Sequence, residues 1–307
     1  MPLPESTARA LSDAELSFDL NVPLAKRVYW RVGGPADAVV TVDSYQALIR
    51  LQRIAFETHT PVFVLGKGSN LLISDAGIRG IVVLLKGELA DAVATDDARP
   101  QVTVGAGMPL VVLLSRAKKN SWTGLGCFAG IPGSVGGAVR MNAGSILGET
   151  DVPLVHVDLV HRDGTPQRLT TSDLQMSYRT SHLPDGAIIA TATFQTTGAD
   201  TETEQAVLKT FLERRKATQP LHLPSCGSTF RNPPGDHSGR LIEISGLKGY
   251  RVGGACVSEK HANFVVNDAP CTANDIRAVI EHVEDEVERQ HGVRMQREVH
   301  FVGEWTV

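Results

Sequence analysis

Two glycine-rich segments of the chain combine residue types that bind anionic cofactors. The first, Gly66-Lys67-Gly68-Ser69-Asn70-Leu71-Leu72, follows the apolar run Val62–Leu65, which we expect to be a buried strand. Its backbone N–H groups can form a nest for a pyrophosphate, and Ser69 and Asn70 add side-chain donors. The segment matches neither the Walker A motif nor the GxGxxG fingerprint, so by itself it is equally typical of a tight turn.

The second segment, Ile131-Pro132-Gly133-Ser134-Val135-Gly136-Gly137-Ala138, places bare backbone in an apolar stretch. Glycine lets the main chain approach a ligand closely or turn with positive φ. A second phosphate or an aromatic ring system beside this backbone would explain the composition. A close crossing of two strands is the alternative.

Five motifs follow one another along the chain in a fixed order. They are VLGKGSNLLISD, GCFAGIPGSVGGAVRMNAGSILGE, MSYRTS, CGSTFRNP and SEKHANFVVN. Together they resemble the UDP-N-acetylenolpyruvoylglucosamine reductase (MurB) family over roughly residues 25–303, nearly the whole chain.

The resemblance implies an α+β protein with a two-part FAD-binding region of the vanillyl-alcohol-oxidase/MurB type and a C-terminal α+β substrate-binding domain. The boundaries that we predict are 17–88 and 89–200 for the two FAD-binding subdomains and 201–307 for the substrate-binding domain. In this family FAD is bound non-covalently, NADPH reduces the flavin, and hydride passes to the enolpyruvyl double bond to give UDP-N-acetylmuramate. That reaction belongs to peptidoglycan synthesis in the bacterial cytoplasm.

The resemblance also predicts which residues surround the flavin. We expect them in the two glycine-rich segments and just beyond the second: Gly66, Lys67, Gly68, Ser69, Asn70, Leu71, Gly130, Pro132, Gly133, Ser134, Gly136, Gly137, Asn142 and Gly144.

Three residues match the catalytic positions of the family: Arg179 in MSYRTS, Ser228 in CGSTF and Glu298 in REVHF. Hydride addition to the terminal methylene builds negative charge at the neighbouring carbon and its carboxylate. Preorganised donors that stabilise such charge are often the largest catalytic contribution. Arg179 and a protonated Glu298 suit the carboxylate, and Ser228 then delivers a proton to the carbon.

Each of the three has an alternative interpretation without the resemblance. Arg179 could be a surface cation at a strand end, Ser228 a turn cap, and Glu298 the polar face of an alternating strand. Glu304 is a competing carboxylate, but it lies beside the chain end.

Departures from the family pattern concern the substrate. Arg231 stands where the family usually has Lys, and its planar fork can still hold phosphates. With it we predict Tyr178 and Asn232 as substrate-binding residues. Arg179 and Ser228 are 49 positions apart, with no long tyrosine-bearing insertion, which resembles the shorter type II subgroup.

Other functions remain open at this point. A flavin oxidase of small alcohols would keep the glycine segments without the three catalytic residues, and a non-enzymatic nucleotide-binding module would need no acid pair. Cys127, Cys226, Cys256 and Cys271 form no CxxC pair and indicate reduced thiols rather than a disulfide framework or a zinc site.

The elements that position these residues follow from apolar periodicity. Strands are expected at 38–42, 62–65, 81–85, 101–104, 155–161, 188–196, 262–266 and 298–302. Ser44 should cap one helix, and Pro109 should lie in the first turn of another. A helix over 203–218 should bury Val207, Leu208, Phe211 and Leu212, and a last helix should run from a Thr272–Asp275 capping box to Gly292.

Composition limits the possible partners. The 307 residues carry 30 basic and 34 acidic side chains, a net charge of −4, which disfavours nucleic-acid binding. No apolar run reaches about 18 residues, so no membrane span is expected. Residues 1–16 look like a polar, partly disordered leader, and the oligomeric state stays open with a monomer favoured.

Overall fold

The computed structural model describes residues 3–95, 100–198 and 200–305. It divides into two compact units. Unit 1 comprises residues 1–20, 37–67 and 80–213, and unit 2 comprises residues 21–36, 68–79 and 214–307. Both units are therefore assembled from separate stretches of sequence. The subdomain boundaries predicted after residues 88 and 200 stay predictions.

A four-stranded sheet carries the first glycine-rich segment. Its order is β1 (Phe18–Pro23), β2 (Pro35–Val42), β5 (Ile78–Leu85) and β3 (Val62–Val64), with β3 parallel to β5. Helix α2 (Tyr45–Glu57) connects β2 to β3, and the Ser44 hydroxyl accepts from the Ala47 N–H at its start. The strand–helix–strand order predicted for this region is confirmed.

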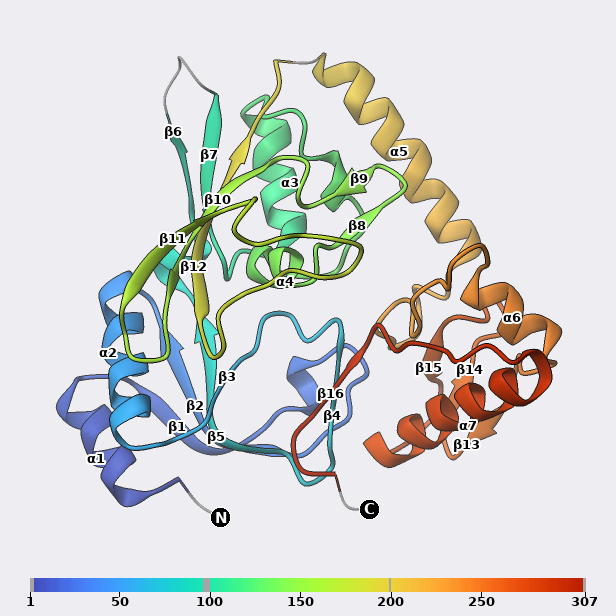
Figure 1. Cartoon of the computed structure of the whole chain (residues 1–307), viewed down its shortest axis with the longest axis horizontal. Coiled ribbons are helices and arrows are strands. Elements are labelled where there is room, and N and C mark those ends of the chain that lie inside the picture. The colour runs from blue at the N-terminus through green and yellow to red at the C-terminus, as the bar shows by residue number, and fades with distance from the viewer. Residues whose placement is uncertain (1–2, 96–99, 199, 306–307) are drawn as a thin grey trace. The chain divides into compact units, whose positions relative to one another are not determined.

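The prediction of a disordered leader is wrong for the described residues. Residues Glu5–Asp13 form helix α1, which packs beside α2 (Figure 1). Leu11 is fully buried, and Thr7 shares a 2.8 Å hydrogen bond with Thr60. One buried leucine in a nine-residue helix is too weak a periodic signal to detect in the sequence. Met1 and Pro2 lie outside the described residues.

A five-stranded antiparallel sheet forms the rest of the unit 1 core. Its order is β11 (Pro166–Thr170), β10 (Leu154–Val160), β12 (Ile188–Gln195), β7 (Gln101–Gly105) and β6 (Ala92–Thr95). Helix α4 (Val135–Arg140) packs over β12 and β7. Helix α3 (Leu110–Lys119) follows Pro109, which lies at the N-cap rather than in the first turn as predicted. The three central strands were predicted, whereas the edge strands β6 and β11 were not.

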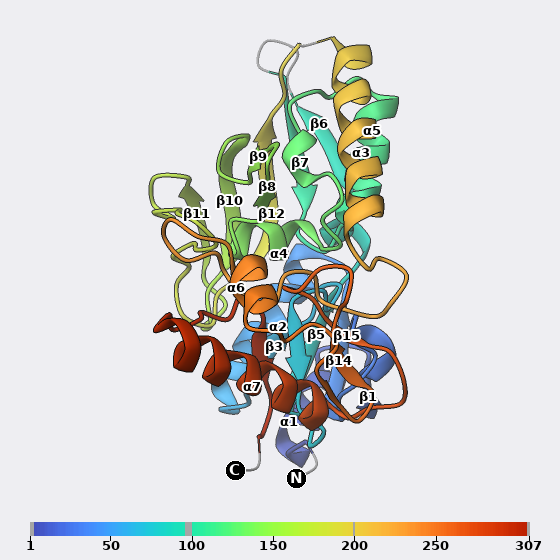
Figure 2. The same cartoon turned by 90° about the vertical axis from the view of Figure 1, so that its right-hand side faces the viewer.

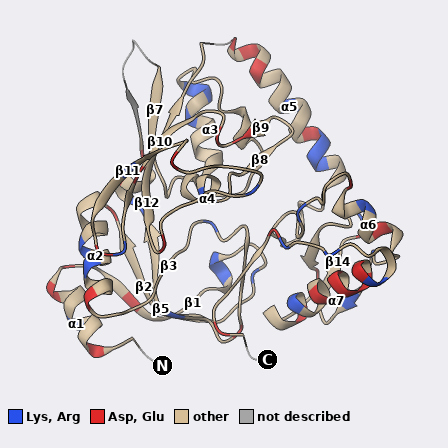
Figure 3. Cartoon of the chain, viewed as in Figure 1, with Lys and Arg blue, Asp and Glu red and all other residues tan. Residues whose placement is uncertain are grey.

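Helix α5 (Thr201–Thr218) corrects the prediction of an inward-facing apolar stripe. None of its residues is buried, and Val207 and Leu212 are 50% and 45% exposed. Only part of the stripe packs: a Cβ placed on Gly126 would lie 3.3 Å from Leu208 Cδ2. Acidic residues lie in its first turn and basic residues in its last turn (Figure 3), so its charges complement the helix dipole.

Unit 2 is built on a three-stranded antiparallel sheet, β13 (Arg251–Val252), β14 (Ala255–Val257) and β15 (Val265–Asn267). Helix α7 (Ala273–His291) packs on all three strands, and the short helix α6 (Ser238–Ile244) packs against α7. Figure 2 shows α6 and α7 from the side. The Thr272–Asp275 capping box and the left-handed Gly292 stop are confirmed. β15 begins three residues later than the predicted strand.

A parallel pair of short strands completes unit 2. β4 (Leu71–Ile73) pairs with β16 (His300–Val302), so that residues 71 and 300 are register partners. The pair directly follows the first glycine-rich segment, and β16 is shorter than the predicted strand 298–302. Among the described residues, no helix is both long and apolar enough to cross a membrane.

Candidate active site

The first glycine-rich segment offers backbone donors, as the sequence suggested. In the described part of the chain, no hydrogen bond is made by the backbone N–H groups of residues 66–70. The Gly68 carbonyl accepts from the Tyr29 N–H at 3.1 Å, which fixes the loop while leaving those donors available. Gly68 has φ +62°, and a Cβ there would lie 2.7 Å from Val28 Cγ1. The loop therefore fits an anionic group such as a pyrophosphate.

The second glycine-rich segment lies beside Gly66, the first residue of the other segment, within unit 1. A Cβ on Gly66 would collide with Ser134 Oγ. Ser134 is buried and occupies the N-cap position of α4, yet its side chain makes no capping hydrogen bond. Gly66 and Ser134 are thus neighbours, and a side chain on Gly66 would require the Ser134 hydroxyl to move.

Gly136 has a packing role. It lies within α4, where its N–H donates to the Ala106 carbonyl at 2.8 Å, and the Val135 N–H donates to the Met108 carbonyl at 2.9 Å. A Cβ on Gly136 would lie 3.0 Å from Ala106 Cβ. For this residue a close approach of two main-chain segments explains the glycine, and its N–H is not available to a phosphate.

Asn142 and Gly144 organise the chain after α4. Asn142 is completely buried and donates from Nδ2 to Glu149 Oε2 and to the Ser177 carbonyl, at 3.2 and 3.1 Å. Its Oδ1 accepts from the Asp151 N–H. Its amide therefore has three protein partners already.

Arg179 occupies a strained and well-held position. Ser177 and Thr180 exchange two backbone hydrogen bonds around it, and its own φ is +55°. Its Nη1 lies 3.2 Å from Glu149 Oε1, and its Nη2 donates to the Gly144 carbonyl at 3.0 Å. Tyr178 is 45% exposed, with the guanidinium carbon 4.8 Å from its ring centroid. A non-glycine residue held at positive φ is a frequent mark of a functional site.

Ser228 and Glu298 lie on paired segments of unit 2. The Glu298 N–H donates to the Thr229 carbonyl at 2.8 Å, and Phe230 bridges Arg297 in the antiparallel sense. Ser228 immediately precedes this ladder. The structure therefore brings the predicted proton donor and the predicted acid into neighbouring positions of the main chain, whereas Arg179 belongs to unit 1.

Asn70 ties the glycine-rich segment to Glu298. Its Nδ2 donates to the Glu298 carbonyl at 2.9 Å, and its own carbonyl accepts from the His300 N–H at 3.0 Å. The side-chain donor that we assigned to the cofactor is thus engaged by the backbone of the predicted acid. By contrast, the carboxylate of Glu304 is 65% exposed and lies 3.7 Å from Arg79.

Asn263 holds the other side of the Ser228 segment, and the sequence prediction missed it. It is 4% exposed; its Oδ1 accepts from the Phe230 N–H and its Nδ2 donates to the Phe230 carbonyl, at 2.9 and 2.8 Å. Its carbonyl accepts from the Thr229 N–H. The only sequence signal was its place in the motif SEKHANFVVN.

Cys226 lies two residues before Ser228 and contacts the first glycine-rich segment. Its thiol is buried and lies 3.6 Å from the Leu71 carbonyl and 3.8 Å from the Gly68 carbonyl. Burial raises the pKa of Cys226 to about 12, so the thiol stays protonated near neutral pH. It serves as a weak donor to the glycine-rich loop rather than as a nucleophile.

The predicted substrate residues Arg231 and Asn232 continue the Ser228 segment. The Arg231 N–H donates to the Gln296 carbonyl at 2.9 Å, which extends the ladder. Asn232 Oδ1 accepts from the Ser238 N–H at the start of α6. The Asn232 side chain therefore already contributes to the entry of a helix.

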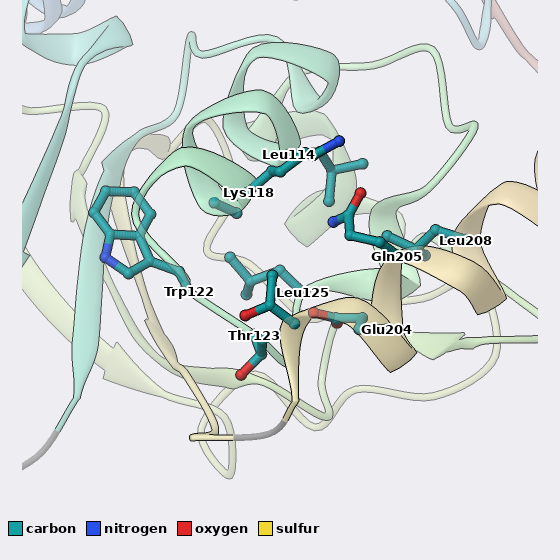
Figure 4. A pocket seen from close by; sticks show the side chains of 10 residues that line it. Leu114, Lys118, Trp122, Thr123, Leu125, Glu204, Gln205 and Leu208 are labelled. Atoms are coloured by element: carbon teal, nitrogen blue, oxygen red, sulfur yellow. The ribbon is translucent and has the colours of Figure 1, made fainter.

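A small pocket elsewhere in unit 1 is unrelated to these residues. Side chains from α3, from residues 122–125 and from α5 line it, among them Trp122, Leu125 and Glu204 (Figure 4). Its space of about 10 Å³ has room for one water molecule. None of the predicted site residues lines it.

Comparison with known proteins first defines the class. Residues 36–170 match the family described as "FAD binding domain", and residues 219–302 match "UDP-N-acetylenolpyruvoylglucosamine reductase, C-terminal domain". The chain is therefore an α+β FAD-binding protein with a separate C-terminal domain, which confirms the predicted fold class and cofactor. Berberine bridge enzyme, 12% identical with a TM-score of 0.50 over 66% of this chain, is similar in fold alone.

Relatives identify the family within this class. UDP-N-acetylenolpyruvoylglucosamine reductase 2 of Symbiobacterium thermophilum is 43% identical over 92% of this chain and 91% of its own length. The enzyme of Methylococcus capsulatus is 41% identical over 99% of both chains. The crystal structure of the Thermus caldophilus enzyme is 34% identical, with a TM-score of 0.79 over 94% of this chain and 98% of its own. The chain belongs to the UDP-N-acetylenolpyruvoylglucosamine reductase family, as its motifs suggested.

Proposed function

We propose that this chain reduces the enolpyruvyl group of UDP-N-acetylglucosamine enolpyruvate to the lactyl ether of UDP-N-acetylmuramate, with NADPH as hydride donor. The observation that carries the proposal is the 43% identity to UDP-N-acetylenolpyruvoylglucosamine reductase 2 of Symbiobacterium thermophilum, over nearly the full length of both chains. The free N–H groups of residues 66–70 support it, because they fit the pyrophosphate of a dinucleotide cofactor.

FAD, when bound, would supply the two-electron chemistry that links NADPH to the substrate double bond. On the protein side, the backbone of residues 66–70 would hold the phosphates, and Ser134 with Gly133 would line the cofactor. The reaction adds one hydride and one proton across the double bond, so a proton donor must complement the flavin.

Arg179 and Glu298 act on the carboxylate next to the reacting carbon. Arg179 supplies a fixed positive charge, and a protonated Glu298 supplies a hydrogen-bond donor as charge develops. Groups of this kind stabilise a transition state most when each is held by its own surroundings before the reaction begins. The ladder between residues 229–231 and 296–298 supports this role for Glu298 by fixing its main chain.

Ser228 delivers the proton that completes the addition. Its hydroxyl gives this proton to the carbon that bears the carboxylate, whereas the hydride goes to the terminal methylene carbon. Solvent later reprotonates the serine. The rigid surroundings of Ser228 support the assignment, because Thr229 and Phe230 are hydrogen-bonded on both sides. Arg231 is proposed to hold the substrate diphosphate.

Setting and assembly are proposed from the same family membership. We expect the protein to act as a monomer in the bacterial cytoplasm, within peptidoglycan precursor synthesis, and without nucleic-acid partners, as its net charge of −4 suggests. Size-exclusion chromatography with light scattering checks the monomer against a theoretical mass of 32.9 kDa.

One experiment tests the reaction itself. Purified protein should show flavin absorbance that denaturation releases, NADPH should bleach it, and the enolpyruvyl nucleotide should restore it without oxygen. Formation of one lactyl ether per flavin reoxidised completes the balance. Colourless protein, or flavin that only oxygen reoxidises, would contradict the proposal.

A further inference from the structure

Glu149, the last residue of the motif GCFAGIPGSVGGAVRMNAGSILGE, lies against the candidate catalytic cation, although the sequence analysis assigned it no role. It ends the short hairpin formed by β8 (Gly144–Ser145) and β9 (Gly148–Glu149). One carboxylate oxygen lies 3.2 Å from Arg179 Nη1, and the other accepts from Asn142 Nδ2 at 3.2 Å. The carboxylate therefore bridges a buried amide and a cation.

The hairpin presents two acceptors to the guanidinium fork. Its strands approach so closely that a Cβ on Gly144 would lie 2.5 Å from the Gly148 carbonyl oxygen and 2.7 Å from Glu149 Cα. This approach places the Gly144 carbonyl next to the Glu149 carboxylate. Arg179 donates from Nη2 to the former and contacts the latter through Nη1. Two acceptors fix both the position and the plane of a guanidinium, which one acceptor cannot do.

The amide behind Glu149 is rigid. Asn142 is fully buried and is itself fixed by the Ser177 carbonyl and the Asp151 N–H. Because Ser177 begins the turn that carries Arg179, Asn142 is bonded both to the turn and to the carboxylate that receives its side chain. The backbone of Arg179 is strained at φ +55°, and such a conformation persists only where its surroundings over-determine it.

Folding stability is a poor explanation for this ion pair. The side chains of Arg179 and Glu149 remain 16% and 30% exposed, and partly exposed ion pairs contribute little to stability. Positioning is the better explanation, because an arginine side chain has many rotamers and must be held in one to act on a developing charge.

We infer that Glu149 is a positioning residue that holds the Arg179 guanidinium for the substrate carboxylate, with Asn142 holding Glu149. The inference rests on the proposed reductase function. It predicts an effect on the step in which the enolpyruvyl nucleotide reoxidises the flavin, and none on the reduction of the flavin by NADPH.

Glu149→Gln separates the two contacts. Arg179 and Asn142 donate to different carboxylate oxygens, and glutamine replaces one of these oxygens by an NH2 group, which cannot accept. One of the two contacts is therefore lost. We expect flavin reoxidation to slow about tenfold in Glu149→Gln and about a hundredfold in Glu149→Ala, while flavin reduction stays within about twofold of wild type. Asp158→Asn is the matched control, since it breaks another partly exposed ion pair of unit 1, with Arg168, outside the site.

A double-mutant cycle distinguishes positioning from local stability. Arg179→Lys removes the fork, so adding Glu149→Gln to it should slow reoxidation less than twofold further. The thermal midpoints of Glu149→Gln and Asp158→Asn should be similar. If Glu149→Ala does not fold, the rates of Glu149→Gln and of the double mutant still test the positioning role of Glu149.

Three results would overturn the inference: reoxidation of Glu149→Gln at the wild-type rate, equal slowing of both half-reactions, or the same factor in the Arg179→Lys background. Failure of the enolpyruvyl nucleotide to reoxidise the flavin of the wild-type protein would instead refute the proposed function. That measurement needs no variant, so the two failures can be told apart.

Discussion

Each unit uses one buried asparagine beside a candidate catalytic residue, but the two asparagines hold different things. Asn142 of unit 1 holds a side chain, Glu149, which in turn contacts Arg179. Asn263 of unit 2 holds main chain, donating to and accepting from Phe230 two residues after Ser228. Unit 1 therefore places a charge through a relay of side chains, whereas unit 2 places its donor and acid through backbone pairing.

This difference predicts that substitutions in the two units affect catalysis and stability differently. A relay of side chains can be altered by one substitution that leaves the fold intact, so catalysis should be lost before stability. A backbone ladder tolerates changes at Ser228 or Glu298 themselves but not removal of the group that pairs with the ladder. Four predictions test this contrast.

The largest effect is expected for Ser228→Ala. Loss of an essential proton donor should slow flavin reoxidation by the enolpyruvyl nucleotide about 10²–10⁴-fold, with NADPH-driven reduction unchanged. Stopped-flow absorbance resolves the two half-reactions. Because the Thr229–Glu298 hydrogen bond involves only main chain, the free energy of unfolding should stay at the wild-type value. Equal slowing of both steps would refute the role of Ser228.

Asn263→Ala should instead act on stability. It leaves the buried N–H and carbonyl of Phe230 without partners, at about 1–3 kcal/mol each. Asn142→Ala should cost less, about 1 kcal/mol, since Glu149 and Ser177 reach solvent. Hydrogen exchange at amides 229–231 and 296–298 should accelerate only in the first variant. Similar losses of stability in both would remove the contrast between the units.

Glu298 should show a graded effect on rate. Glutamine keeps a donor, so Glu298→Gln should reoxidise about tenfold slower than wild type and Glu298→Ala about a hundredfold slower. In the wild type the rate should fall as pH rises, because an ionised carboxylate cannot donate. Glu304→Gln is the control, since that side chain is exposed beside Arg79. Slow flavin reoxidation in Glu304→Gln would show that Glu304, rather than Glu298, is the acid.

The smallest effect is a pH dependence of stability. Burial raises the pKa of Cys226 to about 12, above the ordinary thiol value near 8.5. The folded state thus binds this proton more tightly; its contribution to stability is complete below about pH 8.5 and is lost as pH rises toward 12.

Removing the thiol therefore flattens the alkaline decline. Between pH 8.5 and 10.5, the free energy of unfolding of Cys226→Ala should fall less steeply than that of wild type, by up to about 1.4 kcal/mol per pH unit. Cys127→Ala is the matched variant in unit 1, because burial also raises the pKa of Cys127 to about 12. Only Cys226→Ala should change exchange near Ser228. Identical slopes in all three proteins would contradict a protonated, buried Cys226.

Local signals made part of the fold predictable. Helices α2 and α7 have both a cap and an apolar stripe, the central strand β5 ends in a long apolar run, and β10 and β12 are mostly apolar. Helix α1 and the edge strands β6 and β11 lack such runs, and their formation depends on neighbours far along the chain. The exposure of α5 was missed because apolar spacing alone does not reveal whether a partner surface exists.

The site divides in the same way. Glycine density indicated both candidate cofactor segments, and motif resemblance indicated the candidate catalytic residues Arg179, Ser228 and Glu298. The contacts of Glu149, Asn263 and Gly136 could not be predicted, since each joins residues brought together only by the folded chain. Gly136 shows the limit of the sequence prediction. The glycine-rich composition of its segment suggested a ligand, whereas the nearest neighbour of a Cβ placed there is Ala106.

The parallel pairing of β4 with β16 has a consequence for synthesis of the protein. Leu71 pairs with His300, so β4 leaves the ribosome long before its partner strand β16. At about 5–20 residues per second, roughly ten to fifty seconds pass between translation of the two. During that time Asn70 has neither the Glu298 carbonyl nor the His300 N–H as a partner. A chain truncated before residue 298 therefore lacks this strand pair, and the glycine-rich segment before β4 keeps its contact with Tyr29 but loses those of Asn70.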